Sequence, residues 1–245
     1  MQSKKDIGFG KKIRATWLDS ALESAAEGAC FEDIKVDLTR EVAADNSGPE
    51  AVRKIMACIN RIWFNPPDYC QALHLDGLRL FREGKANDMK GFLHWGMTIA
   101  AYPFVGSVAE SFGRFAKLQD EVRIIDIARR MRERFGDRDF VQRIARYDVS
   151  SFLDWGAIVE TKIKGAYIAG TLPAPKRHEH LAWLIEAILH AREEPQVPFI
   201  QLSHNPMLFP FRIEPFSASH LRCNPRLKLV RHGLNEEWVS IEPSS

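Results

Sequence analysis

Residues 107–170 are the part of the sequence that most restricts the fold, because helical and extended patterns follow one another there in a definite order. Ser107 and Glu110 form a capping-box pattern that opens the first helix of this stretch. The segment EVRIIDIARRMRERFG follows, in which a short extended lead passes into a second helix that Gly136 ends. The first half of the stretch is therefore predicted to be helix, short extended segment and helix.

The second half of the stretch adds a third helix and a hairpin. Asp137 is placed to cap this helix, its apolar residues fall near one face, and Gly156 terminates it. Residues 157–170 alternate apolar and polar side chains around a turn at Lys164 and Gly165, which predicts a β-hairpin. This order of elements is that of a winged helix, a helix-turn-helix with a β-wing attached.

The third helix carries the side chains that a DNA-recognition helix needs, with one apolar face for packing and long donors on the other. On helical spacing Arg138, Gln142 and Arg146 lie on one line, with Asp139 and Arg143 beside it. Arginine and glutamine read guanine and adenine edges through paired hydrogen bonds, and arginine also neutralises phosphates. Two lysines near the hairpin tip are placed to reach the DNA backbone or minor groove. The predicted DNA-binding residues are Arg138, Gln142, Arg143, Arg146, Lys162 and Lys164.

The distribution of charge suits contact with a polyanion, although the net charge is only +2. Residues 114–146 contain ten Arg or Lys against six Asp or Glu, a local excess of +4. Residues 4–14 hold five basic residues against one acidic residue, and residues 222–231 hold four basic residues and no acidic one. Such clusters are found on surfaces that meet nucleic acid, and they are found equally on solvated surfaces and on winged helices that contact only proteins.

Outside the winged helix, the sequence predicts mostly helices. Residues 31–45 fit either a short helix or an extended connection. Near the other end of the chain, the last two apolar segments after Pro195 predict a terminal β-hairpin. Helical patterns occupy residues 11–27, 47–63, 68–84, 87–102 and 178–194. We therefore expect a mainly α fold: a helical N-terminal region at 1–88, a central winged helix-turn-helix at 89–172 and a small α/β C-terminal cap at 173–245.

Several features point to a cytoplasmic protein that has no contact with a membrane. The most apolar segment, FLHWGMTIAAYPFVG, is shorter than the roughly 18 residues of a membrane helix and is interrupted by Pro103. The N-terminal residues have no apolar stretch behind their basic side chains, unlike a signal peptide. The four cysteines lie far apart without a CxxC pair, which is typical of reduced thiols.

The layout over residues 11–170 resembles that of a known family. A helical half leads through FNPPDYCQALHLDGLRLFREGKANDMKGFLHWGMTIAAYPFVGSVAESFGRF into a winged helix closing on SSFLDWGAI, as in the BrxA-like accessory proteins of bacterial BREX phage-defence systems. The resemblance implies a small, non-enzymatic protein that binds double-stranded DNA, with its helix-turn-helix at residues 124–156. The chain after Pro195 has no counterpart in this resemblance.

Three patterns imitate catalytic or metal sites. GFGKK lacks both the spacing of a phosphate-binding loop and a preceding strand. Asp154, followed by Glu160 and Lys162, imitates the D…ExK pattern of metal-dependent nucleases, but its spacing is tight and the segment already fits the wing. The histidines of the last third of the chain lack the compact spacing of a zinc site. We predict no enzymatic activity, no metal and no cofactor.

The sequence thus predicts a non-catalytic, double-stranded DNA-binding accessory protein of a phage-defence system. Two alternatives stay open: a transcriptional regulator of the winged-helix type, and a protein–protein adaptor that binds other proteins of the same defence operon. The DNA sequence preference, the oligomeric state and the role of residues 195–245 also stay open.

Overall fold

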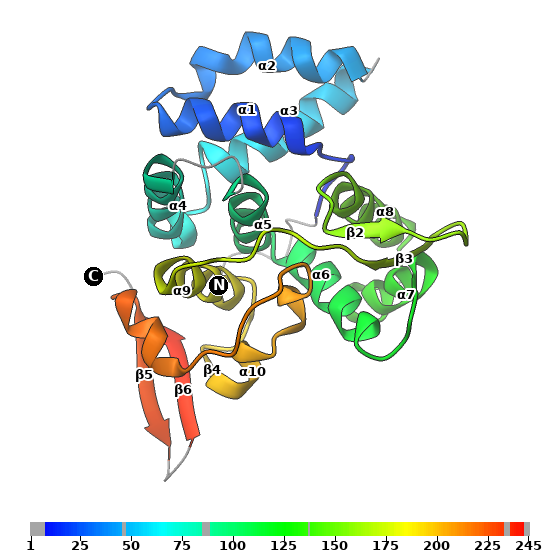
Figure 1. Ribbon diagram of the computed structural model, residues 1–245. Coiled ribbons are helices and arrows are strands. Elements are labelled where there is room, and N and C mark those ends of the chain that lie inside the picture. The colour runs from blue at the N-terminus through cyan, green and yellow to red at the C-terminus, as the bar shows by residue number, and fades with distance from the viewer. Residues whose placement is uncertain (1–7, 46–47, 85–88, 137, 233–235, 243–245) are drawn as a thin grey trace.

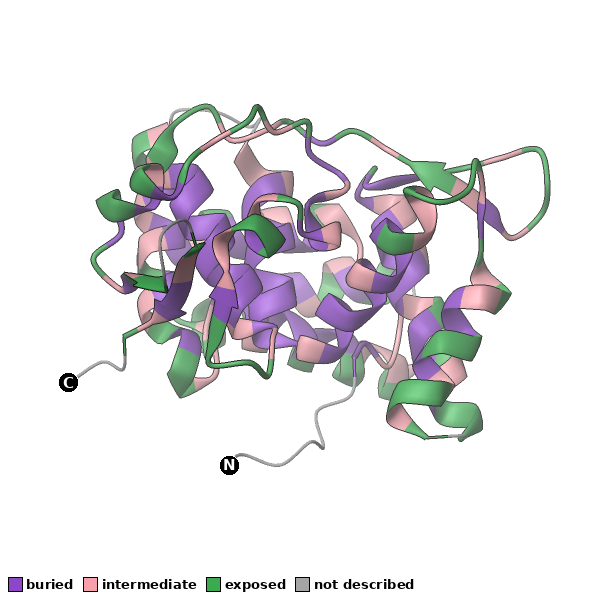
Figure 2. Ribbon diagram, turned by 90° about the horizontal axis from the view of Figure 1, so that it is seen from below, coloured by how far each residue is buried: buried purple, intermediate pink, exposed green. Residues whose placement is uncertain are grey.

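The computed structural model describes residues 8–45, 48–84, 89–136, 138–232 and 236–242. Within these residues the protein is mainly helical, with two small antiparallel sheets of three strands each (Figure 1). This confirms the predicted fold class. Buried apolar side chains form one cluster that extends through all three predicted domains (Figure 2). The domain boundaries themselves stay a prediction.

Three helices form a layer at the N-terminal end of the chain, at the top of Figure 1. They are α1 (Ala15–Ala26), α2 (Phe31–Asp45) and α3 (Pro49–Trp63). The segment that fitted either a helix or an extended connection is thus a helix, α2. Two interactions stabilise the start of α2. The acidic side chains of its first turn interact favourably with the helix dipole, and the Asp33 carboxylate accepts a hydrogen bond from the backbone N–H of Cys30 at 2.8 Å. Pro49 begins α3, a position that proline favours.

Three further helices form the middle of the molecule. They are α4 (Gln71–Gly84), preceded by the short 3₁₀ helix η1 (Asp68–Cys70), α5 (Lys90–Ala101) and α9 (His178–His190). Helix α5 is buried along nearly its whole length. It packs so closely on α9 that there is no room for a side chain at Gly96: a Cβ atom there would lie 2.2 Å from the ring of Trp183. The indole N–H of Trp183 also donates to the carbonyl of Leu73 at 2.8 Å, which ties α9 to α4.

The winged helix lies at the right of Figure 1. Its elements are α6 (Pro103–Ala116), β1 (Val122–Arg123), α7 (Ile124–Phe135), α8 (Asp139–Asp154), β2 (Ile158–Glu160) and β3 (Ala166–Ala169). The sheet has the order β1-β3-β2, so the strand between the first two helices pairs with the second strand of the hairpin. This is the strand order of a winged helix, and the hairpin turn at Gly165 has the positive φ of +76° that favours glycine.

The predicted start of α6 is wrong. The helix begins at Pro103 and not at Ser107, because proline is pre-organised for the first helical position. Ser107 is already inside the helix, where its hydroxyl donates to the carbonyl of Pro103 at 3.0 Å. Glu110 does not cap either, since it pairs with Arg114 at 2.7 Å.

The C-terminal cap contains the predicted terminal hairpin and one strand that the sequence did not reveal. Its elements are β4 (Gln196–Pro198), α10 (Phe199–Ser203), η3 (Pro206–Leu208), η4 (Ala218–Cys223), β5 (Leu227–His232) and β6 (Glu236–Ile241), with the sheet order β4-β6-β5. Glu186 of α9 holds this cap in place by accepting from Asn224 at 2.6 Å and from Arg226 at 2.7 Å. Burial acts to raise the pKa of Glu186, but His190, Arg226 and Asn224 together lower it to about 2.

Candidate nucleic-acid interface

Helix α8 separates its side chains into a buried face and an exposed face, as a recognition helix must. Val141, Ile144 and Phe152 are buried, and Phe152 packs on Trp95 of α5. On the opposite face Arg143 and Arg146 are exposed and Gln142 is half-buried. The structure therefore presents these three predicted DNA-binding side chains on one side of one helix.

Arg138 does not continue the line of Gln142 and Arg146. Its backbone is extended, with φ −125° and ψ 134°, and it stands at the N-cap position of α8. Helical spacing therefore does not apply to it, and the side chain lies exposed at the start of the helix. The predicted cap, Asp137, lies outside the described residues.

The wing lies beside α8 and brings the two predicted lysines to an exposed loop (Figures 1 and 2). Lys162 and Lys164 belong to the tip that joins β2 to β3, and both are exposed. The wing and α8 are in electrostatic contact at Tyr167 of β3. Burial and then Glu160 raise the pKa of this phenol, while the nearby Arg146 lowers it. Arg146 thus faces the side of α8 that carries the wing.

The predicted cations have no acidic partner, unlike four other arginines of the winged helix, although Arg123 of β1 also lacks one among the described residues. Among the described residues, no carboxylate pairs with Arg138, Arg143, Arg146, Lys162 or Lys164. By contrast, Arg114, Arg129, Arg130 and Arg134 each pair with a glutamate or aspartate. The unpaired positive charge of the winged helix is therefore concentrated on α8 and the wing, where the exposed carboxylates are Asp139 at the start of α8 and Glu160 on β2.

An N-terminal arm, residues 8–15, lies along one flank of α8. The backbone N–H groups of Phe9, Ile13 and Ala15 donate to Asp148, Ser151 and Asp154, each at 2.9 Å. No pattern in the sequence indicates this contact. GFGKK is thus a packing segment in which Phe9 is fully buried, and the arm fixes the position of α8 without covering its exposed face.

A cleft of about 470 Å³ lies between α3, the N-terminal arm and α8. Its rim carries Lys11, Arg53, Lys54 and Arg143, and its floor is apolar. Lys11 stands over the ring of Tyr147 at 5.5 Å from the centroid and makes no ion pair with another described residue. The cationic surface therefore extends from Arg143 to Lys11. Lys4 and Lys5, which belong to the basic cluster at residues 4–14, lie outside the described residues.

The other basic segment, at residues 222–231, is only partly used in internal pairing. Arg226 binds Glu186 and Asp76, whereas Lys228 lies 3.5 Å from Glu242 and Arg231 lies 3.8 Å from Glu237. Arg222 is exposed and has no acidic partner among the described residues, so this cluster keeps part of its charge free.

The residues of the D…ExK pattern, Asp154, Glu160 and Lys162, take part in structural contacts and in the wing. Asp154 accepts from the backbone of Ala15 and pairs with Lys12 at 2.7 Å, while Glu160 and Lys162 belong to the wing. Within the described ranges no three His, Cys, Asp or Glu side chains are placed to hold a metal ion. All four cysteines are free thiols, and no helix in the described part of the chain is long and apolar enough to cross a membrane.

No family model, curated protein or solved structure matches this chain. The exposed face of α8, the wing and the N-terminal arm are therefore the features from which a function can be inferred.

Proposed function

We propose that the protein binds double-stranded DNA, with α8 in the major groove and the wing on the adjacent backbone, as a non-catalytic cytoplasmic accessory protein. The observation that carries the proposal is the set of cations on α8 and the wing that have no described acidic partner, in a module where Arg114, Arg129, Arg130 and Arg134 are paired with carboxylates. Phosphate contacts supply most of the affinity of protein–DNA interfaces, so unpaired cations are the groups expected to contribute most to binding. The proposed role in phage defence is supported by the resemblance of the layout to that of the BrxA-like accessory proteins.

Titration of a duplex of about 20 base pairs at several salt concentrations tests the proposal, with binding followed by fluorescence anisotropy. Five phosphate contacts correspond to a slope of about −4.5 in log K against log salt. Replacement of Arg138, Arg143 and Arg146 by alanine is expected to abolish most of this binding. Arg129→Ala is the matched control, because Arg129 is on α7 and pairs with Asp126. Absence of duplex binding at low salt, or binding unchanged in the triple variant, would refute the proposal.

The adaptor alternative is favoured by one observation, an apolar surface on the wing. Val159 and Ile168 face each other across β2 and β3 and are 48% and 42% exposed, and Ile163 near the tip is 50% exposed. Aspartate at Val159 and Ile168 would disrupt a protein contact there. Loss of binding to another protein of the same operon, with DNA affinity unchanged, would support the adaptor role. The transcriptional-regulator alternative predicts instead a dimer on a palindromic site, which selection from random duplexes tests directly.

A further inference from the structure

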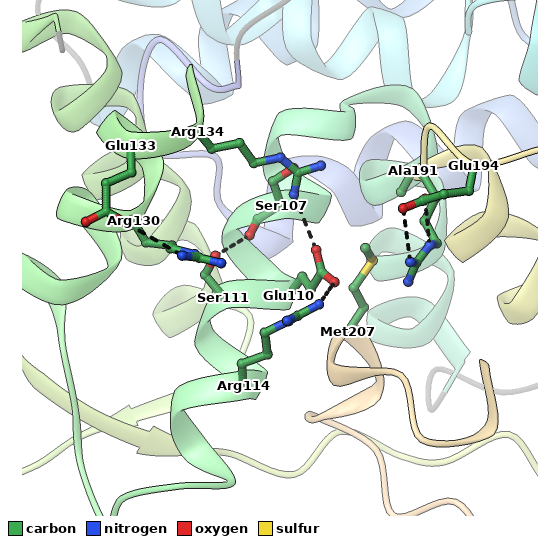
Figure 3. A pocket seen from close by; sticks show the side chains of 11 residues that line it. Ser107, Glu110, Ser111, Arg114, Arg130, Glu133, Arg134, Ala191, Glu194 and Met207 are labelled. Atoms are coloured by element: carbon green, nitrogen blue, oxygen red, sulfur yellow. Dashed lines mark hydrogen bonds and ion pairs between the residues drawn. The ribbon is translucent and has the colours of Figure 1, made fainter. Parts of the chain in front are cut away.

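A second site lies on the winged helix away from the residues proposed to bind DNA. It is a pocket of about 390 Å³, formed where α6 and α7 meet the end of α9 and the C-terminal cap (Figure 3). Small-molecule sites commonly have volumes of roughly 300 to 1,000 Å³. Four arginines line it: Arg114 from α6, Arg130 and Arg134 from α7, and Arg192 from the segment after α9.

The pocket holds more guanidinium groups than carboxylates. Glu110 is shared by Arg114 at 2.7 Å and Arg134 at 3.4 Å, so one negative charge faces two positive ones. The remaining two arginines each have one partner, Glu133 for Arg130 and Glu194 for Arg192. The four guanidiniums and three carboxylates leave a positive excess in a concave site.

Two of the four arginines are held loosely. A guanidinium–carboxylate hydrogen bond is normally about 2.7–2.9 Å long. The Arg134–Glu110 distance is 3.4 Å and the Arg130–Glu133 distance is 3.6 Å. These arginines stand one turn apart on α7, and Figure 3 shows both side chains extending toward α6. Their donors are therefore available to a ligand with a better geometry than the present carboxylates.

The charge of α7 also acts across the pocket. The pKa of Glu194 is lowered although burial acts to raise it, because Arg192 hydrogen-bonds this carboxylate and Arg134 adds a favourable charge. The winged helix and the segment after α9 thus share one electrostatic environment. Ala191 and Met207 add an apolar wall beside the arginines. The site combines a cationic side with a small apolar side.

We propose that this pocket binds a small phosphorylated ligand, whose phosphoryl group is held by Arg130 and Arg134. Guanidinium groups match phosphate oxygens in pairs of parallel hydrogen bonds, and a dianion would replace the loose glutamate contacts. The proposal does not depend on DNA binding, since neither Arg130 nor Arg134 belongs to the surface proposed above.

Isothermal titration of the full chain with inorganic pyrophosphate, at constant ionic strength, tests the site. A parallel titration with adenosine monophosphate distinguishes free phosphate from a phosphate ester. We expect saturable binding of at least one probe. Arg130→Ala should weaken it about tenfold, the effect of losing one charge-assisted contact. Arg134→Gln should act similarly.

Arg129→Ala is the matched control, because Arg129 also lies on α7 and is 62% exposed, but pairs with Asp126 outside the pocket. It removes the same charge and should leave the affinity for the probe unchanged. Arg130 is 56% exposed, so its alanine variant should fold and decide the result even if Arg134→Gln destabilises the protein. Absence of saturable binding of either probe, or equal weakening by Arg129→Ala and Arg130→Ala, overturns the proposal.

Discussion

The carboxylate of Asp148 in α8 is fully buried and accepts the backbone N–H of Phe9 at 2.9 Å. Its second oxygen has no hydrogen-bond partner among the described residues. Burial raises the pKa of this carboxyl well above its ordinary value, and the single bond from Phe9 only partly opposes the effect. Helix α8 is thus joined to the N-terminal arm by a group that prefers to be neutral.

Asp148→Asn should reveal this preference as a pH dependence. A raised folded-state pKa means that the native protein binds the proton more tightly than the unfolded chain. The free energy of unfolding of the wild type therefore falls as the pH rises above about 4, until the raised pKa is passed. The asparagine variant keeps the acceptor for Phe9 and lacks this loss. We expect it to be the more stable protein at pH 8, and the difference to shrink toward pH 4.

Urea unfolding at a series of pH values measures this difference. Asp120→Asn is the control, because Asp120 is exposed in the turn before β1. The neighbouring Cys58 does not interfere, since burial, with Asp148 contributing, raises its pKa to about 11. A constant difference between wild type and Asp148→Asn across the pH range would contradict the prediction.

Gly8→Ala should destabilise the contact between the arm and α8. Gly8 has φ +29°, and an added Cβ would lie 2.5 Å from Ile144 and 2.8 Å from Phe104. Overpacking of this kind costs about 1–3 kcal/mol, which denaturant unfolding can measure. Gly28→Ala separates clash from backbone strain, because Gly28 has φ +92° but open space around its Cβ position. Equal losses in the two variants would mean that the steric contact adds nothing.

Glu186→Gln should destabilise the C-terminal cap in a pH-dependent way. The pKa of Glu186 is lowered to about 2, so its contribution is present above the ordinary value of 4.5 and is lost as the pH falls toward 2. The shift corresponds to roughly 3 kcal/mol at neutral pH. Wild type and variant should therefore differ most at pH 7 and converge below pH 4.5 in thermal or urea unfolding.

Glu242→Gln serves as the comparison for the cap. Glu242 lies 3.5 Å from Lys228 and about half of its side chain is exposed, so its loss should change the free energy of unfolding by less than about 1 kcal/mol. A similar loss in both variants would show that the buried pair has no special role.

Single substitutions on α8 should change the salt dependence of duplex binding by measurable steps. Arg143→Ala and Arg146→Ala each remove one phosphate or base contact, which corresponds to a reduction of about 1 in the slope of log K against log salt. The double variant should lose about 2, because the two guanidiniums have no shared described partner. An unchanged slope in both single variants would place the DNA, if bound, elsewhere on the protein.

The sequence predicted the local part of this architecture well. Helical spacing separates the buried Val141 and Ile144 from the exposed Arg143 and Arg146, and the turn at Gly165 follows from the conformational freedom of glycine. Such patterns depend on residues within a few positions of each other. They fail at element ends, as at Pro103, where two start signals compete.

Contacts between distant residues could not be predicted in the same way. Phe9 meets Asp148, and Arg134 lies close enough to Glu194 to lower its pKa, yet neither pair shares a periodic pattern. The strand β4 was missed because Pro195 and Pro198 hide a three-residue strand that exists only through its pairing with β6. The exposed cations of α8 were predicted, but their lack of acidic partners became visible only in three dimensions.

The docking of the N-terminal arm also has a consequence for how the chain is made. Phe9 and Ala15 are synthesised well before α8, because the carboxylates that accept their N–H groups lie 139 residues later. At about 5–20 residues per second, the arm waits on the order of 10 s on the ribosome before α8 emerges. During that interval the N-terminal helices lack this contact, and the winged helix is completed by a segment that was translated before it.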